Sequence, residues 1–346
     1  MINEISEKYI DTQKLYDDNI LTKLKLKDTI ILNGEVRHIC ELKKEELLIF
    51  NVYNRNINKN EICIYKKIMD ENKKEKIVPH FSVNEEKSIL HLKELKDGNL
   101  LIVNDNQFKI SEITNSQIVI KDIQKQVLPK NEYFKDIIES INGYLISISY
   151  SPNDIKKNQV NLWKKDLLSG DYIIINTIKI NEKPLGLLEI NKHYLGVLSE
   201  LNILYIYFLQ TTEIICYKKI KMPDNSPFKT MIKVIEDGIL FLFEKKLILF
   251  RLSSLQIEPS LNNNFIDVCY INNSNNYFLT VFSNNDANGL FLINIDLVKC
   301  KIFKIKNANI NHPLKINCIL HLNNGNIITG SNDKTAKIWD IQFNAN

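Results

Sequence analysis

GSNDKTAKIWDI, residues 330–341, closes a segment in which apolar residues recur every three positions. Ile316, Ile319 and Leu322 lead through a glycine into a second short apolar run that begins at Ile327. A spacing of three can mark a helix, but the runs that follow are only about four to eight residues long and are bounded by Asn, Asp and Gly, as strands and tight turns are. The segment therefore predicts short β-strands joined by turns.

The same skeleton recurs six more times upstream. Each copy adds two further short runs, as in the third copy with VNLWKKD from Val160 and YIIINTIKI from Tyr172. Four short strands per copy, repeated at a period of roughly 36 to 53 residues, is the sequence form of a β-propeller. We therefore predict an all-β, seven-bladed propeller over residues 24–346, with blades that start near residues 36, 89, 135, 184, 229, 265 and 316.

The last copy ends after its third strand, so its outer strand must come from elsewhere, because an exposed strand edge invites aggregation. The run LKLKDTIIL, Leu24–Leu32, precedes the first copy and has a strand-like composition. We predict that it closes the ring as the outer strand of the last blade. We expect residues 1–23 to form an N-terminal extension. It carries a helical spacing of apolar and polar residues at Ile2, Ile5, Tyr9, Thr12 and Tyr16. Two interpretations stay open, a short amphipathic helix that binds a partner and a partly ordered tail.

The last copy resembles a WD40 repeat in its polar residues as well as in its strands. His312 stands four residues before Ile316, although Asn311 replaces the usual glycine, and Trp339 is followed by an aspartate. The resemblance implies that four side chains form a hydrogen-bonded relay inside the blade: His312, Thr329, Asp333 and Trp339. Such a network makes physical sense, because a buried carboxylate and a buried indole N–H are costly unless each finds a partner.

The other copies depart from the WD40 pattern. The sequence LWKKD, residues 162–166, keeps the tryptophan but inserts two lysines before the acid. Tyr65, Tyr207 and Phe250 fill the tryptophan position elsewhere. We expect these blades to be held by apolar packing alone, so the specific motif covers about thirty residues while the strand pattern covers nearly the whole chain.

Composition and charge disfavour several kinds of partner and location for this protein. The chain is 44% hydrophobic and 25% charged with a formal net charge of +4, and its lysines and glutamates are interspersed, which disfavours nucleic acid as a partner. The N-terminus lacks the apolar core of a signal peptide, and no apolar run is long enough to insert into a membrane. The six cysteines form no CxxC pair, as expected of reduced thiols in a cytoplasmic protein.

Catalytic and metal-binding motifs are weak. GNIITGS, residues 325–331, has the glycine spacing of a phosphate loop but carries Ser331 where the lysine would stand. His38 with Cys40, and His80 with His91, do not extend to a set of three or four metal ligands at a known spacing. The sequence therefore predicts no catalytic residue, no metal and no cofactor, and a protein that is not an enzyme.

What remains is recognition of a partner by the loops of a rigid propeller. In WD40 proteins the contact positions on the top face flank the first apolar residue of each repeat, with another before the turn aspartate. The resemblance places a partner-binding ring on these residues: Glu35, Arg37, Ser88, Leu90, Phe134, Asp136, Lys183, Leu185, Phe228, Thr230, Asn264, Ile266, Lys315, Asn317 and Asn332.

The ring mixes apolar residues with charges of both signs, which suits a peptide or protein with an apolar anchor. An equally open interpretation is that some of these apolar residues belong to the core. We expect a non-catalytic scaffold, itself a monomer, that binds proteins within a larger complex. Two alternatives stay open: an enzymatic or small-ligand-binding propeller with its site at the channel mouth, and a permanent subunit of a coat, pore or cytoskeletal assembly.

Overall fold

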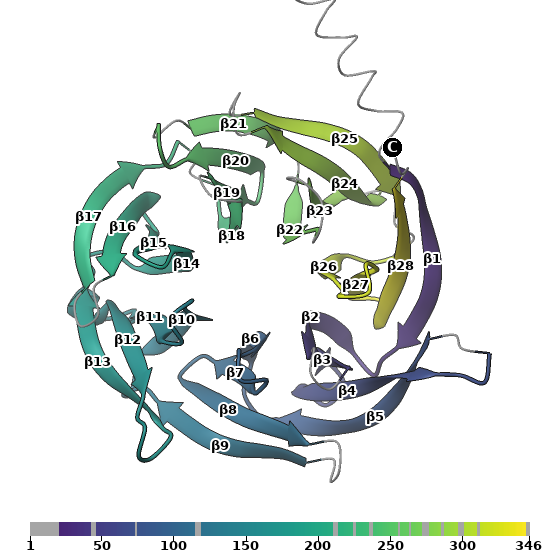
Figure 1. Ribbon diagram of the computed structural model, residues 1–346, viewed down its shortest axis with the longest axis horizontal. Coiled ribbons are helices and arrows are strands. Elements are labelled where there is room, and N and C mark those ends of the chain that lie inside the picture. The colour runs from purple at the N-terminus through teal and green to yellow at the C-terminus, as the bar shows by residue number, and fades with distance from the viewer. Residues whose placement is uncertain are drawn as a thin grey trace, which may run out of the picture.

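Seven four-stranded antiparallel sheets are arranged as blades around a common axis (Figure 1). The computed structural model describes most of the chain, namely residues 21–42, 46–72, 75–114, 119–209, 214–223, 226–234, 238–254, 257–262, 264–271, 277–284, 287–296, 301–309 and 312–343. This architecture confirms the predicted seven-bladed propeller. The prediction for residues 1–20 lies outside the described residues.

The first four blades follow one another along the chain, each from its inner to its outer strand. They consist of β2 (Glu35–Leu42), β3 (Leu47–Asn54), β4 (Lys59–Met69) and β5 (Glu75–Glu85) in blade 1; β6 (Ile89–Glu94), β7 (Leu100–Asn104), β8 (Gln107–Thr114) and β9 (Val119–Val127) in blade 2; β10 (Tyr133–Glu139), β11 (Leu145–Tyr150), β12 (Gln159–Lys165) and β13 (Tyr172–Lys179) in blade 3; β14 (Pro184–Asn191), β15 (Tyr194–Ser199), β16 (Ile203–Leu209) and β17 (Ile214–Lys221) in blade 4.

The last three blades continue this pattern, and blade 7 takes its outer strand from the start of the described chain. They consist of β18 (Phe228–Val234), β19 (Gly238–Phe243), β20 (Lys246–Arg251) and β21 (Ile257–Asn262) in blade 5; β22 (Phe265–Tyr270), β23 (Tyr277–Asn284), β24 (Ala287–Asp296) and β25 (Lys301–Asn309) in blade 6; β26 (Ile316–His321), β27 (Ile327–Ser331), β28 (Thr335–Phe343) and β1 (Leu21–Ile31) in blade 7. A 3-10 turn, η1 (Ile155–Lys157), interrupts blade 3.

The ring closes through β1. This strand pairs antiparallel with β28, so that Ile30 lies opposite Ala336 and Leu26 lies opposite Trp339. The backbone N–H of Leu32 donates to the carbonyl of Lys334 at 2.9 Å. The predicted closing strand is therefore confirmed, and it begins three residues before the predicted boundary at residue 24.

The core lies between neighbouring blades. Because each sheet is covered on both faces by other sheets, its second strand is buried, as in β7 and β19, where every residue is buried. Packing between blades is close enough to exclude side chains. A Cβ at Gly330 of blade 7 would lie 2.5 Å from Cγ1 of Val36 in blade 1, so only glycine fits there.

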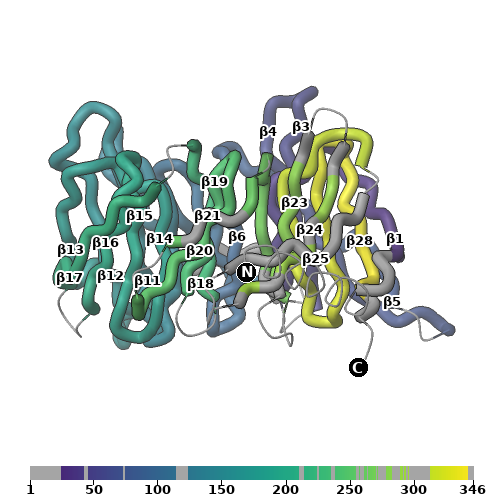
Figure 2. Tube along the Cα trace, turned by 90° about the horizontal axis from the view of Figure 1, so that it is seen from above, coloured from purple at the N-terminus to yellow at the C-terminus, as the bar shows by residue number. Residues whose placement is uncertain are grey.

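All seven inner strands share one irregularity, a register shift near their start. One bulged residue projects there from each blade: Arg37, Leu90, Lys135, Leu185, Lys229, Ile266 and Asn317. Because the shift occurs at the same place in every blade, it identifies equivalent residues in the seven blades. We call the end of the propeller that carries these residues the top face, and Figure 2 shows the propeller from the side, between its top and bottom faces.

Candidate functional site

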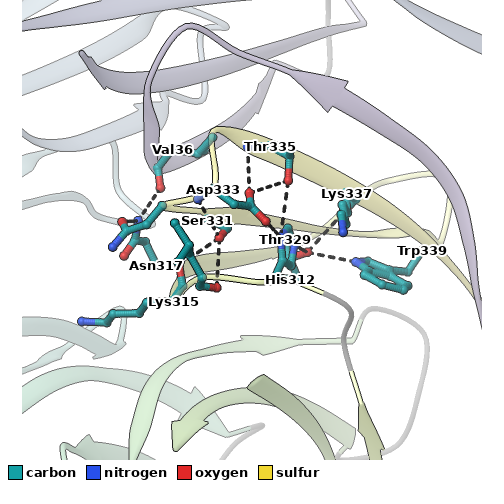
Figure 3. A network of polar contacts seen from close by, with 12 residues as sticks. Val36, His312, Lys315, Asn317, Thr329, Ser331, Asp333, Thr335, Lys337 and Trp339 are labelled. Carbon is teal, nitrogen blue, oxygen red and sulfur yellow. Dashed lines mark hydrogen bonds and ion pairs between the residues drawn. The ribbon is translucent and has the colours of Figure 1, made fainter. Parts of the chain in front are cut away.

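The four side chains assigned to the relay meet inside blade 7 (Figure 3). Nδ1 of His312 lies 2.8 Å from Oδ2 of Asp333, and its Nε2 lies 2.9 Å from Oγ1 of Thr329. The indole Nε1 of Trp339 donates to the same hydroxyl oxygen at 2.9 Å. The relay thus joins the loop before β26, both later strands of the blade and the turn between them, which fixes the geometry of the blade.

Burial and hydrogen bonding act in opposite directions on the pKa of each titratable relay residue, His312 and Asp333. Burial lowers the pKa of His312 and outweighs the neighbouring carboxylate, which alone would raise it. Burial alone would raise the pKa of Asp333, but hydrogen bonds from Thr335 and His312 overcome it, so the pKa of that carboxyl is lowered. The relay therefore favours a neutral imidazole beside an ionised carboxylate.

Blade 3 keeps one bond of this relay. The register places Trp163 opposite Leu145, as Trp339 lies opposite Ile327 in blade 7. The indole Nε1 of Trp163 donates to Oγ of Ser147 at 2.9 Å, and both residues are buried. The expectation that the departing blades hold by apolar packing alone is therefore wrong for blade 3, because its buried indole N–H has a hydroxyl partner.

The top-face ring is misassigned by one residue in two blades. The register shifts follow Phe134 in blade 3 and Phe228 in blade 5, so these are the residues equivalent to Val36, where positions 135 and 229 had been expected. Phe134 is a core residue with 1% of its surface exposed, and its ring contacts Phe108. Phe228 is half-buried against Phe243.

The corrected ring has a different chemistry. In blades 3 and 5 the bulged residues are Lys135 and Lys229, and the residues that precede Phe134 and Phe228 are Tyr133 and Pro227. Two phenylalanines, an aspartate and a threonine are thereby replaced by two lysines, a tyrosine and a proline. In the other five blades the expected positions hold: Glu35, Arg37, Ser88, Leu90, Lys183, Leu185, Asn264, Ile266, Lys315 and Asn317.

Basic residues dominate this corrected ring. Its five cationic side chains are Arg37, Lys135, Lys183, Lys229 and Lys315, and its one acid, Glu35, is buried and paired with Arg55 and Arg37. Two cations lie over aromatic rings, Arg37 at 3.9 Å from the ring centre of Tyr53 and Lys183 at 4.1 Å from that of Tyr150. The top face therefore presents positive charge on partly fixed side chains.

Two hollows adjoin the ring. One, of about 490 Å³, lies on the top face between blades 7 and 1, and its lining includes Glu35, Arg55, Lys315, Asn332 and Lys334. Asn332, which had been placed in the ring, accepts a hydrogen bond from Nδ2 of Asn317 at 2.7 Å. Three of the five predicted ring residues of the first and last copies, Glu35, Lys315 and Asn332, thus lie around one cleft.

The second hollow, of about 360 Å³, lies along the axial wall of blades 2–5 and reaches the top ends of their inner strands. We call it the axial cavity. Its wall is apolar where Leu185, Leu188, Phe228 and Ile232 contribute, and four lysines and one carboxylate surround it: Lys93, Lys135, Lys229, Lys233 and Asp136.

A set of hydrogen bonds that the sequence did not predict joins neighbouring blades at the bottom face. Glu41, Glu139 and Glu189 occupy the same position on their inner strands, and each carboxylate accepts a backbone N–H from the first turn of the preceding blade. The donors are Asn323 for Glu41, Lys96 for Glu139 and Ile141 for Glu189, at 2.7–2.9 Å. These glutamate bridges bond the blades to each other as well as packing them.

Titratable groups also line the axial side without assembling into a metal site. Burial, with help from His91, lowers the pKa of His38 to about 4, and burial raises the pKa of Asp267 to about 6. Asp267 accepts the N–H of Ile319 in the next blade at 3.0 Å. Within the described residues, no group of three or more His, Cys, Asp or Glu is placed to hold a metal ion. In that same part of the chain, no helix is long and apolar enough to cross a membrane.

The chain shares its fold with known structures but not its sequence. No protein-family model matches it, and no curated protein sequence matches it. It is similar to a chain in the solved structure "Crystal Structure of Mitotic Checkpoint Complex", with a TM-score of 0.67 and 11% identity over 91% of this chain and 94% of that one. At this identity the likeness shows the propeller fold alone.

Proposed function

We propose that this chain is a divergent WD40-type propeller that acts as a non-catalytic scaffold and binds other proteins through its top face. The observation that carries the proposal is the corrected ring, which presents basic residues and two hollows on a rigid frame. The relay of blade 7 supports the WD40 assignment, because its four members and their spacing match that repeat. The structural neighbour, a chain from a protein complex, is consistent with a role in an assembly.

Rigidity is what makes this face suited to recognition. In each blade the bulged ring residue lies between two residues that pair with the second strand, so little backbone conformational entropy remains to be lost when a partner binds. Fixed positive charge also accelerates the encounter with an acidic surface and sets its orientation. The proposal includes a cytoplasmic location, which the six cysteines without a CxxC pair favour.

The test is affinity purification from the native cell with quantitative mass spectrometry. The intact protein is compared with a triple variant of the ring, Arg37→Glu, Lys183→Glu and Lys315→Glu. A control triple variant, Lys25→Glu, Lys27→Glu and Lys164→Glu, changes the same amount of charge on exposed lysines outside the ring. Circular dichroism and thermal melts establish that all three proteins are folded.

We expect at least one stoichiometric protein partner that is lost from the ring variant and kept by the control. A partner kept by both variants would show that Arg37, Lys183 and Lys315 are not part of the binding surface. If no protein partner is found, the scaffold assignment fails, and the alternative of a small-ligand-binding or enzymatic propeller takes its place.

A further inference from the structure

The axial cavity combines two features that are rarely combined without a ligand. Part of its wall is apolar and open, since Leu185, Leu188 and Phe228 are only half-buried. Apolar surface left in contact with water is the usual mark of a binding site when it is hollowed and rimmed by polar groups. A volume of about 360 Å³ is near the lower end of ligand pockets, which are roughly 300–1,000 Å³.

The second feature is positive charge without matching anions. Among the described residues, Lys93, Lys135, Lys229 and Lys233 form no ion pair within 4.0 Å, whereas lysines elsewhere do, such as Lys109 with Glu85 at 3.0 Å. Asp136, the carboxylate in the lining, lies 3.7 Å from His91. The cavity therefore has a surplus of cationic side chains around an apolar wall.

Neighbouring groups add to this surplus. Burial lowers the pKa of Lys135, and the nearby charge of Lys183 lowers it further, although Asp136 acts in the opposite direction. Glu189 interacts electrostatically with Lys93 and Lys233 and offsets part of their charge, while both of its oxygens lie 2.8 Å from the backbone nitrogen of Ile141; Lys135 and Lys229 are not among the groups that act on it. An anion that enters the cavity would relieve the mutual repulsion of these lysines.

The close contact between blades 4 and 5 keeps the wall in place. A Cβ at position 186 would lie 2.5 Å from Cε1 of Phe228, so the glycine allows this ring to lie flat against β14. The bulges before Gly186 and Thr230 then direct Leu185 and Lys229 toward the same cavity. An apolar residue and a lysine thus alternate around its top.

We propose that the axial cavity binds an acidic peptide segment of a partner protein, with one apolar side chain of the segment against Leu185 and Phe228 and its carboxylates near Lys135 and Lys229. This inference rests on the proposed function and names the partner's chemistry. A peptide fits better than a nucleic acid because the wall is mainly aliphatic and its one phenyl ring, Phe228, lies half-buried against Phe243, whereas bases stack on successive exposed aromatic faces. It also fits better than a small polyanion, which would leave the apolar wall uncovered.

The experiment is selection of random twelve-residue peptides displayed on phage against the intact protein. Enriched peptides are then synthesised and titrated by fluorescence polarisation against four proteins: the wild type, Lys135→Glu with Lys229→Glu, Leu185→Ser, and the control Lys25→Glu with Lys27→Glu. The control lysines are exposed on the outer strand of blade 7, far from the axial wall. Melting curves check that each variant is folded.

We expect enriched peptides to carry net negative charge and at least one large apolar residue. Their affinity should fall about tenfold or more in the double lysine variant, as the loss of two charge contacts predicts, and severalfold in Leu185→Ser, with the control unchanged. Raising the salt concentration should weaken wild-type binding more than it weakens binding to the double lysine variant.

Neutral or basic consensus peptides, no enrichment, or equal affinity in all four proteins would overturn the inference. So would tight binding of inorganic tripolyphosphate that the enriched peptides do not displace, because a simple anion site would then be present. These outcomes are separable from failure of the scaffold assignment. A partner that depends on the top-face ring but not on Lys135, Lys229 or Leu185 would preserve the proposed function and remove this inference.

Discussion

Blades 7 and 5 fill the same two core positions with different kinds of side chain. In blade 7 the second and third strands place Thr329 and Trp339 in the core, and in blade 5 the register puts Phe241 and Phe250 at the same two positions. All four side chains are buried. One pair is joined by a hydrogen bond within a polar relay, and the other belongs to one apolar cluster, so the fold requires a filled core here but not a polar one.

The other blades show what decides between the two kinds of side chain. Blade 3 pairs Ser147 with Trp163 and keeps the hydrogen bond, whereas blade 1 pairs Phe50 with Tyr65 as edge-to-face rings at 5.3 Å. A buried indole N–H without an acceptor costs about 1–3 kcal/mol. Within the part of the chain that the structure describes, tryptophan therefore occupies this position only where the second strand supplies a hydroxyl.

Truncation of either aromatic should have the largest effect. Phe250→Ala should lower the free energy of unfolding by about 3–5 kcal/mol, because it leaves a cavity in a fully packed blade. Trp339→Ala should reach at least the upper end of that range, since it also removes the partner of Thr329. Urea unfolding followed by circular dichroism measures both, and a fully stable Trp339→Ala protein would remove this residue from the blade core.

Removal of the Thr329 or Ser147 hydroxyl alone should measure how much stability the hydrogen bond adds to the packing of the aromatic ring. Thr329→Val keeps the volume but removes the acceptor of the Trp339 indole N–H and the donor to Nε2 of His312, so it should cost about 2–4 kcal/mol; Ser147→Ala, which removes the acceptor of one indole only, should cost about 1–2 kcal/mol. Adding Trp339→Phe to Thr329→Val should cost less than the sum of the single changes. Additive costs in this double-mutant cycle would show that the two side chains are not coupled.

The glutamate bridges allow a matched comparison between blades 4 and 5. Glu189→Ala should cost about 1–2 kcal/mol, because it leaves the N–H of Ile141 without its charged acceptor. Lys233→Ala changes the equivalent position of blade 5 and should stay within about 0.5 kcal/mol, since this exposed ammonium group cannot accept a backbone N–H of the neighbouring blade. Equal costs for the two variants in urea unfolding would mean that the bridge contributes no stability.

The smallest expected effect is a pH dependence that blade 7 has and the aromatic pair of blade 5 lacks. The pKa values of His312 and Asp333 are both lowered in the folded protein. Below its ordinary pKa of about 6.5 the unfolded state binds a proton at His312 that the folded state resists, so stability falls with falling pH, and Asp333 continues the loss below about pH 4.

His312→Gln should flatten this dependence between pH 6.5 and 5. The comparison is the urea midpoint of the variant against that of the wild type at each pH, because His38 and Asp267 also titrate and contribute equally to both proteins. If the two curves keep a constant difference, His312 carries no pH-linked stability.

The repeat pattern predicted the fold because strand length, turn residues and period all agreed, from the first apolar triplet at Val36 to the tryptophan of blade 7. Two blades were misregistered for a physical reason. The triplet spacing was read back from Ile138 and Ile232, yet the core positions are Ile137 and Met231, one residue earlier. Adjacent strand residues face opposite sides, and here both sides are apolar because Ile138 and Ile232 line the axial cavity.

The site was less predictable than the fold. The relay residues could be found because their spacing repeats a known pattern within one blade. The glutamate bridges could not, since the partner of each carboxylate is a backbone N–H of another blade, which no side-chain pattern reveals. The basic character of the top face was hidden by the register error, because a shift of one residue put Asp136 and Thr230 in the places of Lys135 and Lys229.

The most direct test of the central claim is photo-cross-linking in the native cell from two leucines on opposite faces. A benzoylphenylalanine at Leu185 probes the axial cavity, and one at Leu168, which is 97% exposed in the bottom turn between β12 and β13, probes the opposite end. We predict a discrete protein adduct from position 185 that the Lys135→Glu and Lys229→Glu changes abolish. An adduct from position 168 alone, or an adduct at 185 that survives those changes, would contradict recognition of an acidic partner at the top of the propeller.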